Sequence, residues 1–289
     1  MMKLIECPRD AMQGIKEWIP TELKVQYINQ LLKVGFDSLD FGSFVSAKVI
    51  PQMQDTAEVL RRLDLSITKT KLLAIVASVN GAKNACQFSE ISYLGFPLSA
   101  SETFQLRNTN KTIAQSFDSL KEIQDLCLQS GKKLVVYISM GFGNPYGDPF
   151  DQSIVEKFAQ QLSEIGVQII MLSDTIGVSE PNLIVDLFTQ LNPAFPEIEF
   201  GAHFHSNPRT AMQKIEAAYQ AGCRRFDGAV GGFGGCPMAK DELTGNIATE
   251  KMVQHFLHKG IDLHLSLDAL HKAIEISREI FIYENEAIV

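Results

Sequence analysis

The sequence lacks long hydrophobic runs and any excess of basic residues, and each absence excludes a class of protein. No apolar run approaches the roughly 18 residues that a membrane-spanning helix needs, and the N-terminal residues MMKLIECPRD lack the apolar stretch of a secretory signal. The formal net charge is −8, whereas general binders of nucleic acids or anionic membranes present a basic surface. We therefore expect no nucleic-acid partner and no membrane partner.

Paired cysteines are also absent. The five cysteines are odd in number and never form a CxxC motif; they are Cys7, Cys86, Cys127, Cys223 and Cys236. This pattern is typical of reduced thiols rather than of a disulfide framework. Together with the missing signal, it predicts a cytoplasmic protein.

Internal repeats, low-complexity linkers and breaks in composition are missing as well. The chain has 289 residues, of which 45% are hydrophobic, enough for one large core. We therefore expect one domain over residues 1–289. Within it, the main fold would span about 3–258, and a helical extension would span about 262–289.

Short β-type runs alternate with longer helical patterns along the chain. Strands are predicted at 4–7, 38–44, 72–78, 91–96, 133–140, 168–173, 197–205 and 225–230, and helices at 21–34, 56–63, 81–87, 112–130, 151–165, 180–191, 208–221 and 245–257. Thr21 is predicted as the N-cap of the first helix and Gly35 as its stop. Eight strand–helix units predict a (β/α)8 TIM barrel with extra C-terminal helices. A doubly wound sheet would want a glycine-rich turn after the first strand, which is not there.

Polar residues recur where the predicted strands end. Catalytic groups of such barrels come from the carboxyl ends of the strands and the loops after them. This rule selects Arg9, Asp10, Gln13, Asp40, Ser43, Asp174, Thr175, His203, His205, Cys236 and Asn246. If the barrel closes, these residues meet at one mouth.

Two histidines in the seventh strand suggest a metal site. Because side chains alternate along a strand, His203 and His205 point to the same face. With Asp10 and Asn246 they would form a mixed nitrogen and oxygen ligand set. Such a set suits Mg²⁺ or Mn²⁺, with Zn²⁺, Co²⁺ or Fe²⁺ as alternatives given the imidazoles.

Each motif also has a simpler interpretation. The HxH tripeptide can be accidental, and Arg9-Asp10 can be a local ion pair that closes a loop. Asp174 can cap the following helix, and Cys236 can be a small residue in a flexible turn. Their shared position at the same predicted end of the barrel favours a functional site.

Several motifs together resemble a known family. They are Arg9-Asp10-x-x-Gln13, SFVSxKxxPQM at 43–53, SDTIG at 173–177, HxH at 203–205, GGFGGCP at 231–237 and GNIATE at 245–250. In combination they resemble 3-hydroxy-3-methylglutaryl-CoA lyases, from about Leu4 to about His258. This family belongs to a wider group of metal-dependent lyases and Claisen-type synthases built on TIM barrels.

The resemblance implies retro-Claisen cleavage of an acyl-CoA to acetyl-CoA and acetoacetate. It implies that a divalent cation is held by Asp10, His203, His205 and Asn246, and that Glu6 and Asp40 support this site. It further implies substrate contacts from Arg9, Gln13, Ser43 and Asn144. The expected partner is a small acyl-CoA substrate, and the protein is expected to be a homodimer or a higher homo-oligomer.

Catalytic roles follow from the same resemblance. Arg9 would neutralise the enolate oxygen, since a guanidinium stays charged at any working pH. Cys236, in the glycine-rich loop, would protonate the enolate carbon. Asp174 and His203 are both open as the base or proton relay.

The chain departs from the family pattern at several positions. The usual glycine after Arg-Asp is Ala11, the usual acids are replaced by Ser206 and Lys251, and the second-strand glutamate is shortened to Asp40. These changes weaken the assignment of the substrate. Two alternatives therefore stay open: a Claisen-type synthase or metal aldolase acting on 2-oxo acids, and a catalytically degenerate barrel.

Overall fold

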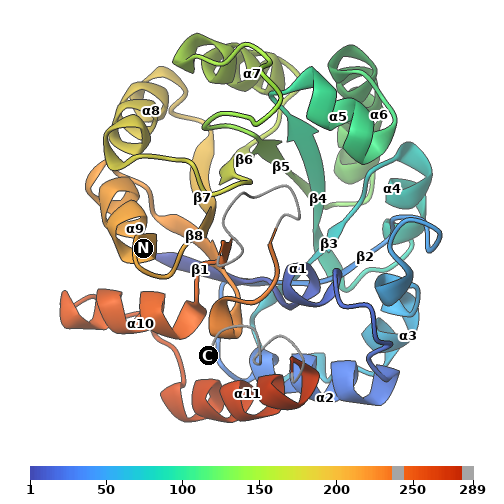
Figure 1. The fold of residues 1–289 in the computed structure, drawn as a ribbon. Coiled ribbons are helices and arrows are strands. Elements are labelled where there is room, and N and C mark those ends of the chain that lie inside the picture. The colour runs from blue at the N-terminus through green and yellow to red at the C-terminus, as the bar shows by residue number, and fades with distance from the viewer. Residues whose placement is uncertain (236–243, 282–289) are drawn as a thin grey trace.

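Eight parallel strands form a closed ring in the computed structural model, which describes residues 1–235 and 244–281. They are β1 Lys3–Glu6, β2 Ser38–Ser43, β3 Lys71–Ile75, β4 Ile91–Ser99, β5 Lys133–Ser139, β6 Ile169–Asp174, β7 Glu199–Ser206 and β8 Arg225–Gly228. The ring closes because β1 pairs with β8 and β6 pairs with β7. The predicted TIM barrel is confirmed, and Figure 1 shows its strands surrounded by helices.

The helices outside the ring follow the strands in turn. They are α2 Thr21–Leu32, α3 Thr56–Arg61, α4 Val79–Ala85, α6 Ile113–Gln129, α7 Gln152–Glu164, α8 Pro181–Ala194, α9 Ala211–Gln220 and α10 Thr249–His258. Side-chain caps fix several starts: Thr112 and Gln115 form a capping box at α6, and Asp151 accepts the backbone N–H of Ile154 at α7.

Two short helices, α1 Pro8–Met12 and α5 Glu102–Thr109, were not predicted. The segment PRDAM is too short to show a helical period, and ETFQLRNT has no continuous apolar stripe. Pro at the first helical position and the Ser101 hydroxyl, which accepts the N–H of Phe104, start these helices instead. Both helices lie at the mouth of the barrel.

Two predicted boundaries are wrong. Thr21 is not the N-cap of α2, because Pro20 precedes the helix and the Thr21 hydroxyl donates to Asp55 at 2.8 Å. The predicted helix over 245–257 begins later, at Thr249. Gly245–Asn246 instead forms a short strand, β9, antiparallel to β7. Tertiary pairing with β7 overrides the local helical pattern there.

The barrel interior has an apolar half and a polar half. The apolar cluster consists of Leu73, Ile75, Tyr93, Val135, Tyr137, Ile169 and Met171, all from β3 to β6. Buried ionisable residues come from the other strands, including Asp40 of β2, His205 of β7 and Asp227 of β8. The polar half therefore lies where β7, β8, β1 and β2 are neighbours.

An extra C-terminal helix, α11 Leu267–Ile280, packs on α2, as Figure 1 shows. The Gln30 side chain donates to the carbonyl of Ala269 at 2.9 Å, and the N–H of Ser266 donates to the carbonyl of Val34 at 2.8 Å. Leu270 and Ala273 are buried in this contact. An extra C-terminal helix is thereby confirmed over Leu267–Ile280, while residues 282–289 of the expected extension lie outside the described residues. Within the described residues, none of the helices combines the length and apolarity that crossing a bilayer requires.

We propose that α11 and the barrel unfold as one domain. Leu270→Ala should lower the free energy of unfolding by about 2–5 kcal/mol, because it removes a buried side chain that is 3% exposed. Leu267→Ala on the same helix is the matched control, since Leu267 is 42% exposed; its expected change is below about 0.5 kcal/mol. Urea unfolding measures both, and equal small effects would show that α11 is not part of the cooperative unit.

Candidate functional site

The cluster at the barrel mouth is assembled from three separate segments. Asp10 lies on α1, directly after β1, and His203 and His205 lie on β7. Asn246 arrives from β9, whose antiparallel register pairs it with His205. The ligand atoms of Asp10, His203 and His205 lie within 4.8 Å of one another. The structure thus brings together the four residues predicted as metal ligands.

His205 presents an unused lone pair to this cluster. Its Nδ1 donates to the carbonyl oxygen of Thr175 at 2.9 Å; since a carbonyl only accepts, Nδ1 carries the proton. In the neutral ring Nε2 is then an acceptor. This atom is buried without a hydrogen-bond partner among the described residues, and it lies 3.7 Å from Oδ2 of Asp10. Two acceptors facing each other in a buried site fit a cation between them.

Asp10 is held as an anion. Its Oδ1 accepts from Arg9 at 2.9 Å and from Gln13 at 3.0 Å, and its Oδ2 accepts from the Asn246 amide at 2.8 Å. Burial alone would raise the pKa of this carboxyl, but Arg9 and the two histidines hold it well below its usual range. The Asn246 amide nitrogen donates to Asp10 and to the carbonyl of Phe233, so neither bond occupies its oxygen.

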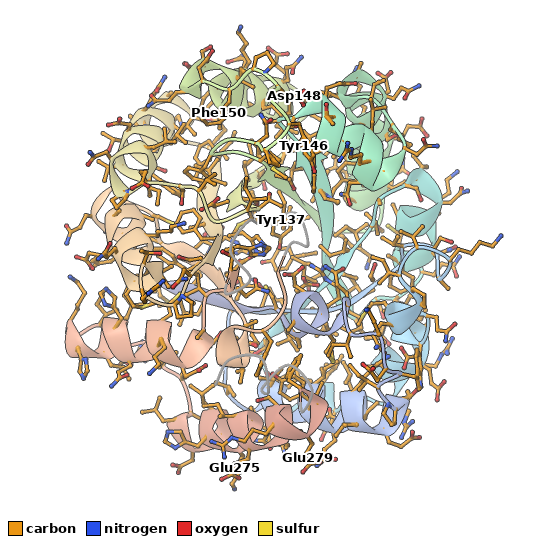
Figure 2. The ribbon with its side chains drawn as sticks, in the orientation of Figure 1. Tyr137, Tyr146, Asp148, Phe150, Glu275 and Glu279 are labelled. Carbon is orange, nitrogen blue, oxygen red and sulfur yellow. The ribbon has the colours of Figure 1, made fainter. Side chains whose placement is uncertain are left out.

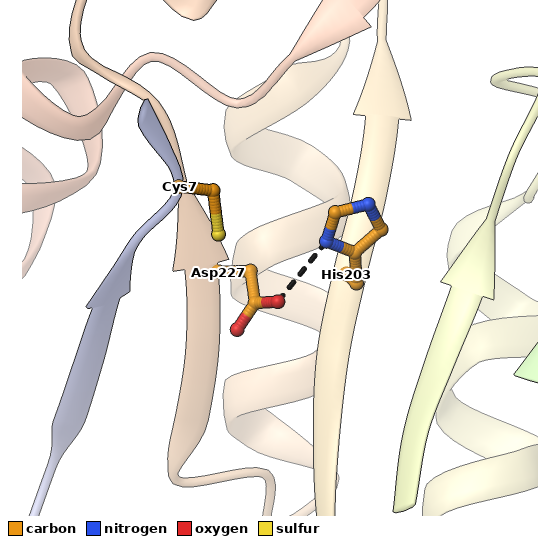
Figure 3. Close-up of side chains that lie close together, drawn as sticks. All are labelled: Cys7, His203 and Asp227. Atoms are coloured by element: carbon orange, nitrogen blue, oxygen red, sulfur yellow. Dashed lines mark hydrogen bonds and ion pairs between the residues drawn. The ribbon is translucent and has the colours of Figure 1, made fainter. Parts of the chain in front are cut away.

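His203 is oriented by a carboxylate on the neighbouring strand. Its Nδ1 donates to Oδ2 of Asp227 at 3.0 Å, as Figure 3 shows. Burial lowers the pKa of His203, but the bond to Asp227 outweighs this and raises it. With Nδ1 protonated, Nε2 is the ring atom available to a metal, an arrangement common among metal-binding histidines. The buried Asp and His cluster therefore fits a divalent cation in its donor types and tautomers.

Arg9 is fixed between two carboxylates. Its Nε donates to both oxygens of Asp40, at 3.2 and 3.0 Å, and Nη2 donates to Asp40 as well. Burial lowers the pKa of Arg9, but Asp40 and Asp10 raise it by more than burial lowers it, so the guanidinium stays charged. Burial raises the pKa of Asp40 to about 6 against the opposing effect of Arg9. The predicted supporting role of Asp40 thus takes the form of a bidentate clamp on Arg9.

Glu6 lies deeper and contacts the loop after β8. Its oxygens accept from the N–H of Val230 and from the hydroxyl of Thr249, and burial raises its pKa to about 8. These contacts connect β1 to the start of α10 and to the turn that leads to Gly234. Glu6 therefore positions the chain around Asn246 rather than contacting the three clustered ligands.

Two predicted site residues, Asp174 and Ser43, bind other parts of the protein rather than the cluster. Asp174 accepts from the N–H groups of Val178 and Ser179 and from buried Lys214, so its carboxylate binds its own loop. The Ser43 hydroxyl donates to the carbonyl of Ile75. Both residues hydrogen-bond within the protein, and their base, relay and substrate roles stay predictions.

Asn144 also organises its own loop. Its oxygen accepts from the N–H groups of Tyr146 and Asp148, and its nitrogen donates to the carbonyl of Asp148. Asp148 in turn accepts from Ser101 and Thr103 at the start of α5. Figure 2 shows Tyr146 and Asp148 away from Tyr137, which lies near the barrel centre. Asn144 thus fixes the rim rather than pointing a free amide to the cluster.

Three residues that depart from the family pattern, Ala11, Ser206 and Lys251, lie in different environments. Ala11 lies inside α1 with helical backbone, so a glycine is not needed there for positive φ. Ser206 is buried and hydrogen-bonds Thr210. Lys251 is exposed on α10. Cys236, the predicted acid, lies outside the described residues.

A cavity of about 240 Å³ opens beside the cluster. Arg9, Asp10, Gln13, Thr175, His203 and His205 form its polar wall. The opposite wall is apolar and includes Val45, Ile50, Ile75, Ala77, Pro97 and Phe104. The cavity can therefore hold a substrate with a polar end at the cluster and an apolar part across from it.

Two functional groups were missed from the sequence. Asp227 is the partner of His203, and the Thr175 carbonyl is the partner of His205. The sequence held one indication of Asp227, a carboxylate inside a predicted strand, where a buried charge needs a partner. A backbone carbonyl leaves no signal in a sequence.

Comparisons with known proteins agree on one family. The HMGL-like family model matches residues 3–276. The chain is 33% identical to hydroxymethylglutaryl-CoA lyase YngG of Bacillus subtilis (strain 168), over 92% of this chain and 88% of that protein. It is 32% identical to the 3-hydroxy-3-isohexenylglutaryl-CoA/hydroxy-methylglutaryl-CoA lyase of Pseudomonas aeruginosa, over 93% of this chain and 90% of that protein.

A solved structure gives the same result. The HMG-CoA lyase from Acinetobacter baumannii, in complex with coenzyme A and 3-methylmalate, is 31% identical to this chain. The TM-score is 0.88, and the match covers 97% of this chain and 91% of that one. Sequence and fold therefore point to the same group of proteins.

The hydrogen bond from His203 to Asp227 yields a testable prediction. Asp227→Asn should weaken Mn²⁺ binding about 10–100-fold, because a neutral amide makes the imidazole a poorer ligand. Titration of Mn²⁺ followed by electron paramagnetic resonance measures this. Asp118→Asn is the matched control, since that side chain is 75% exposed. Unchanged affinity in Asp227→Asn would show that His203 does not depend on this carboxylate for metal binding.

Proposed function

Because this chain belongs to the HMGL-like family of carbon–carbon lyases, we propose that it cleaves 3-hydroxy-3-methylglutaryl-CoA, or a close 3-hydroxyacyl-CoA, to acetyl-CoA and a 3-oxo acid. The reaction breaks the bond between C2 and C3. The C3 hydroxyl loses its proton and becomes a ketone, and the electron pair of the broken bond passes to the thioester enolate. A proton added at C2 then gives acetyl-CoA.

One observation carries the proposal: a buried Asp10 and His205 Nε2, which has no hydrogen-bond partner in the part of the chain that the structure describes, face each other beside Arg9 in one cavity. We propose that Asp10, His203, His205 and Asn246 hold Mg²⁺ or Mn²⁺. When bound, such a cation polarises the substrate hydroxyl and lowers its pKa. The ligand set is complete in this chain, which argues against a degenerate barrel.

Arg9 would stabilise the enolate. It lines the cavity, and its clamp by Asp40 fixes the guanidinium before substrate arrives. A charged donor aimed at the oxygen where negative charge develops is typically worth about 10²–10³ in rate. Arg9 therefore has the position and the permanent charge that this step needs.

The proton steps remain proposals from the sequence and from burial. Cys236 is proposed to protonate C2, as a thiol in the glycine-rich loop. The base or relay stays open between Asp174, which is engaged with Lys214, and His203, whose Nδ1 donates to Asp227 and whose Nε2 faces the proposed metal. A cytoplasmic location and a homo-oligomeric state also remain predictions.

The coenzyme is proposed to enter along α5. The cavity reaches Phe104, Asn108 and Thr109 on that helix, and Asn108 is exposed. Because Asn108 is exposed, this part of the cavity lies near solvent, as a pantetheine arm requires. The Acinetobacter baumannii enzyme, which is similar to this chain, was solved in complex with coenzyme A.

The apolar wall favours a second candidate substrate, in which C3 carries a longer alkyl group than methyl. Ile75 and Tyr137 are each only 7% exposed and line the cavity together with its other apolar residues. A buried apolar surface suits the C3 substituent, because the pantetheine arm must leave towards solvent. The similar Pseudomonas aeruginosa protein is named for both the methyl and the isohexenyl substrate.

The primary test is a steady-state assay of the purified protein with 3-hydroxy-3-methylglutaryl-CoA. We expect formation of acetyl-CoA and acetoacetate that EDTA abolishes and Mg²⁺ or Mn²⁺ restores. Arg9→Met should reduce kcat about 10²–10³-fold, because it removes the enolate partner. Arg61→Met, at an exposed position on α3, is the control and should leave kcat unchanged. Condensation of a 2-oxo acid with acetyl-CoA, without any cleavage, would replace this proposal with the synthase alternative.

A panel of 3-hydroxy-3-alkylglutaryl-CoA thioesters tests the second candidate. If the apolar wall binds the C3 substituent, Ala77→Leu should lower kcat/KM about 10–200-fold for a long alkyl group, because it fills that space. The same variant should leave kcat/KM for the methyl substrate within about threefold. Equal losses for both substrates would assign the wall to the pantetheine arm instead.

A further inference from the structure

We infer that the buried ion pair of Lys214 and Asp174 is a positioning device that fixes the orientation of the His205 ring. The inference rests on the proposed metal centre. Neither residue is among the ligands, and the two come from different elements, α9 and the end of β6. The pair would act through the loop that joins β6 to α8.

The buried ammonium group of Lys214 is surrounded by hydrogen-bond acceptors. Its Nζ donates to Oδ2 of Asp174 at 2.8 Å, to the carbonyl of Gly177 at 3.0 Å and to the carbonyl of His205 at 3.4 Å. Its side chain is only 4% exposed. One ammonium group therefore holds both the loop after β6 and the backbone of the metal-binding strand.

Asp174 fixes the same loop from its start. Its Oδ1 accepts the N–H of Val178, and its Oδ2 accepts the N–H of Ser179, both at 2.9 Å. Gly177 lies between these contacts with φ of +74°, a conformation that favours glycine. A Cβ there would also lie 2.7 Å from the Thr244 side chain. The loop has little room for another path.

Thr175 transmits this constraint to the ligand. It lies between Asp174 and Gly177, and its hydroxyl accepts the N–H of Met140 at 2.9 Å. Its carbonyl accepts the Nδ1 proton of His205 at 2.9 Å. Holding that carbonyl in place keeps the proton on Nδ1, so the Nε2 lone pair stays directed at Asp10.

Stability alone does not explain the pair. Replacing a buried ion pair by apolar residues is often neutral or stabilising, whereas removing one partner leaves an uncompensated charge. A single variant would therefore mix the two effects. The double variant Lys214→Met/Asp174→Asn removes both charges and isolates the loss of the clamp.

The test compares Lys214→Met, the double variant and the wild-type chain. Mn²⁺ affinity is measured by titration, and ¹⁵N-histidine NMR reports the tautomer of His205 independently of activity. We expect both variants to bind Mn²⁺ about 10–100-fold more weakly, with His205 populating both tautomers. Lys259→Met is the matched control, because Lys259 forms a half-exposed ion pair with Glu216; its affinity should be unchanged.

The double variant decides between positioning and simple stabilisation. Wild-type Mn²⁺ affinity and a single His205 tautomer in the double variant would overturn the inference, whatever the single variant does. If Lys214→Met fails to fold, the double variant still gives the answer. If the wild-type chain does not bind Mn²⁺, the proposed metal centre fails, while the tautomer of His205 still tests the clamp.

Discussion

The closure of the sheet is the constraint on which the site depends. Pairing of β1 with β8 and of β6 with β7 makes β7, β8 and β1 consecutive in the ring, although β1 lies about 200 residues away from the other two along the chain. Asp10, Asp227 and His203 become neighbours only because of this order. The short strand β9 then pairs with the end of β7 and adds Asn246. An open sheet with the same local sequence would leave these groups on different edges.

Charge distribution inside the barrel follows from the same order. The polar half contains Asp10 and Asp40 around the single guanidinium of Arg9, and Asp227 beside His203. Buried carboxylates are costly unless they are paired or coordinate a metal. Two carboxylates share Arg9, so a divalent cation at Asp10 would offset the remaining negative charge. The apolar half, from β3 to β6, lowers the local polarity of this site, which would strengthen the attraction between such a cation and an anionic group.

The sequence was most informative where a regular spacing of residues determines both the fold and the position of a site residue. Alternation along β7 correctly predicted that His203 and His205 share a face, and the strand–helix rhythm predicted the barrel. It was least informative where a distant partner decides the outcome. Gly245 and Asn246 form a strand instead of the expected helix because they pair with the last residues of β7. The Thr21 hydroxyl donates to Asp55 instead of capping its helix. The carbonyl of Thr175, which sets the His205 tautomer, is common to every residue type and cannot be read from a sequence.

Asp174 shows why a motif does not determine a role by itself. The SDTIG segment matches the family pattern, and in isolation its carboxylate is free to act as a base or to cap a helix. Lys214, 40 residues later on α9, reaches the same carboxylate at 2.8 Å. With that cation and two backbone N–H groups bound, the Asp174 carboxylate holds its own loop in place. Asp174 then acts on the site indirectly, because the loop that it anchors carries the Thr175 carbonyl that orients His205.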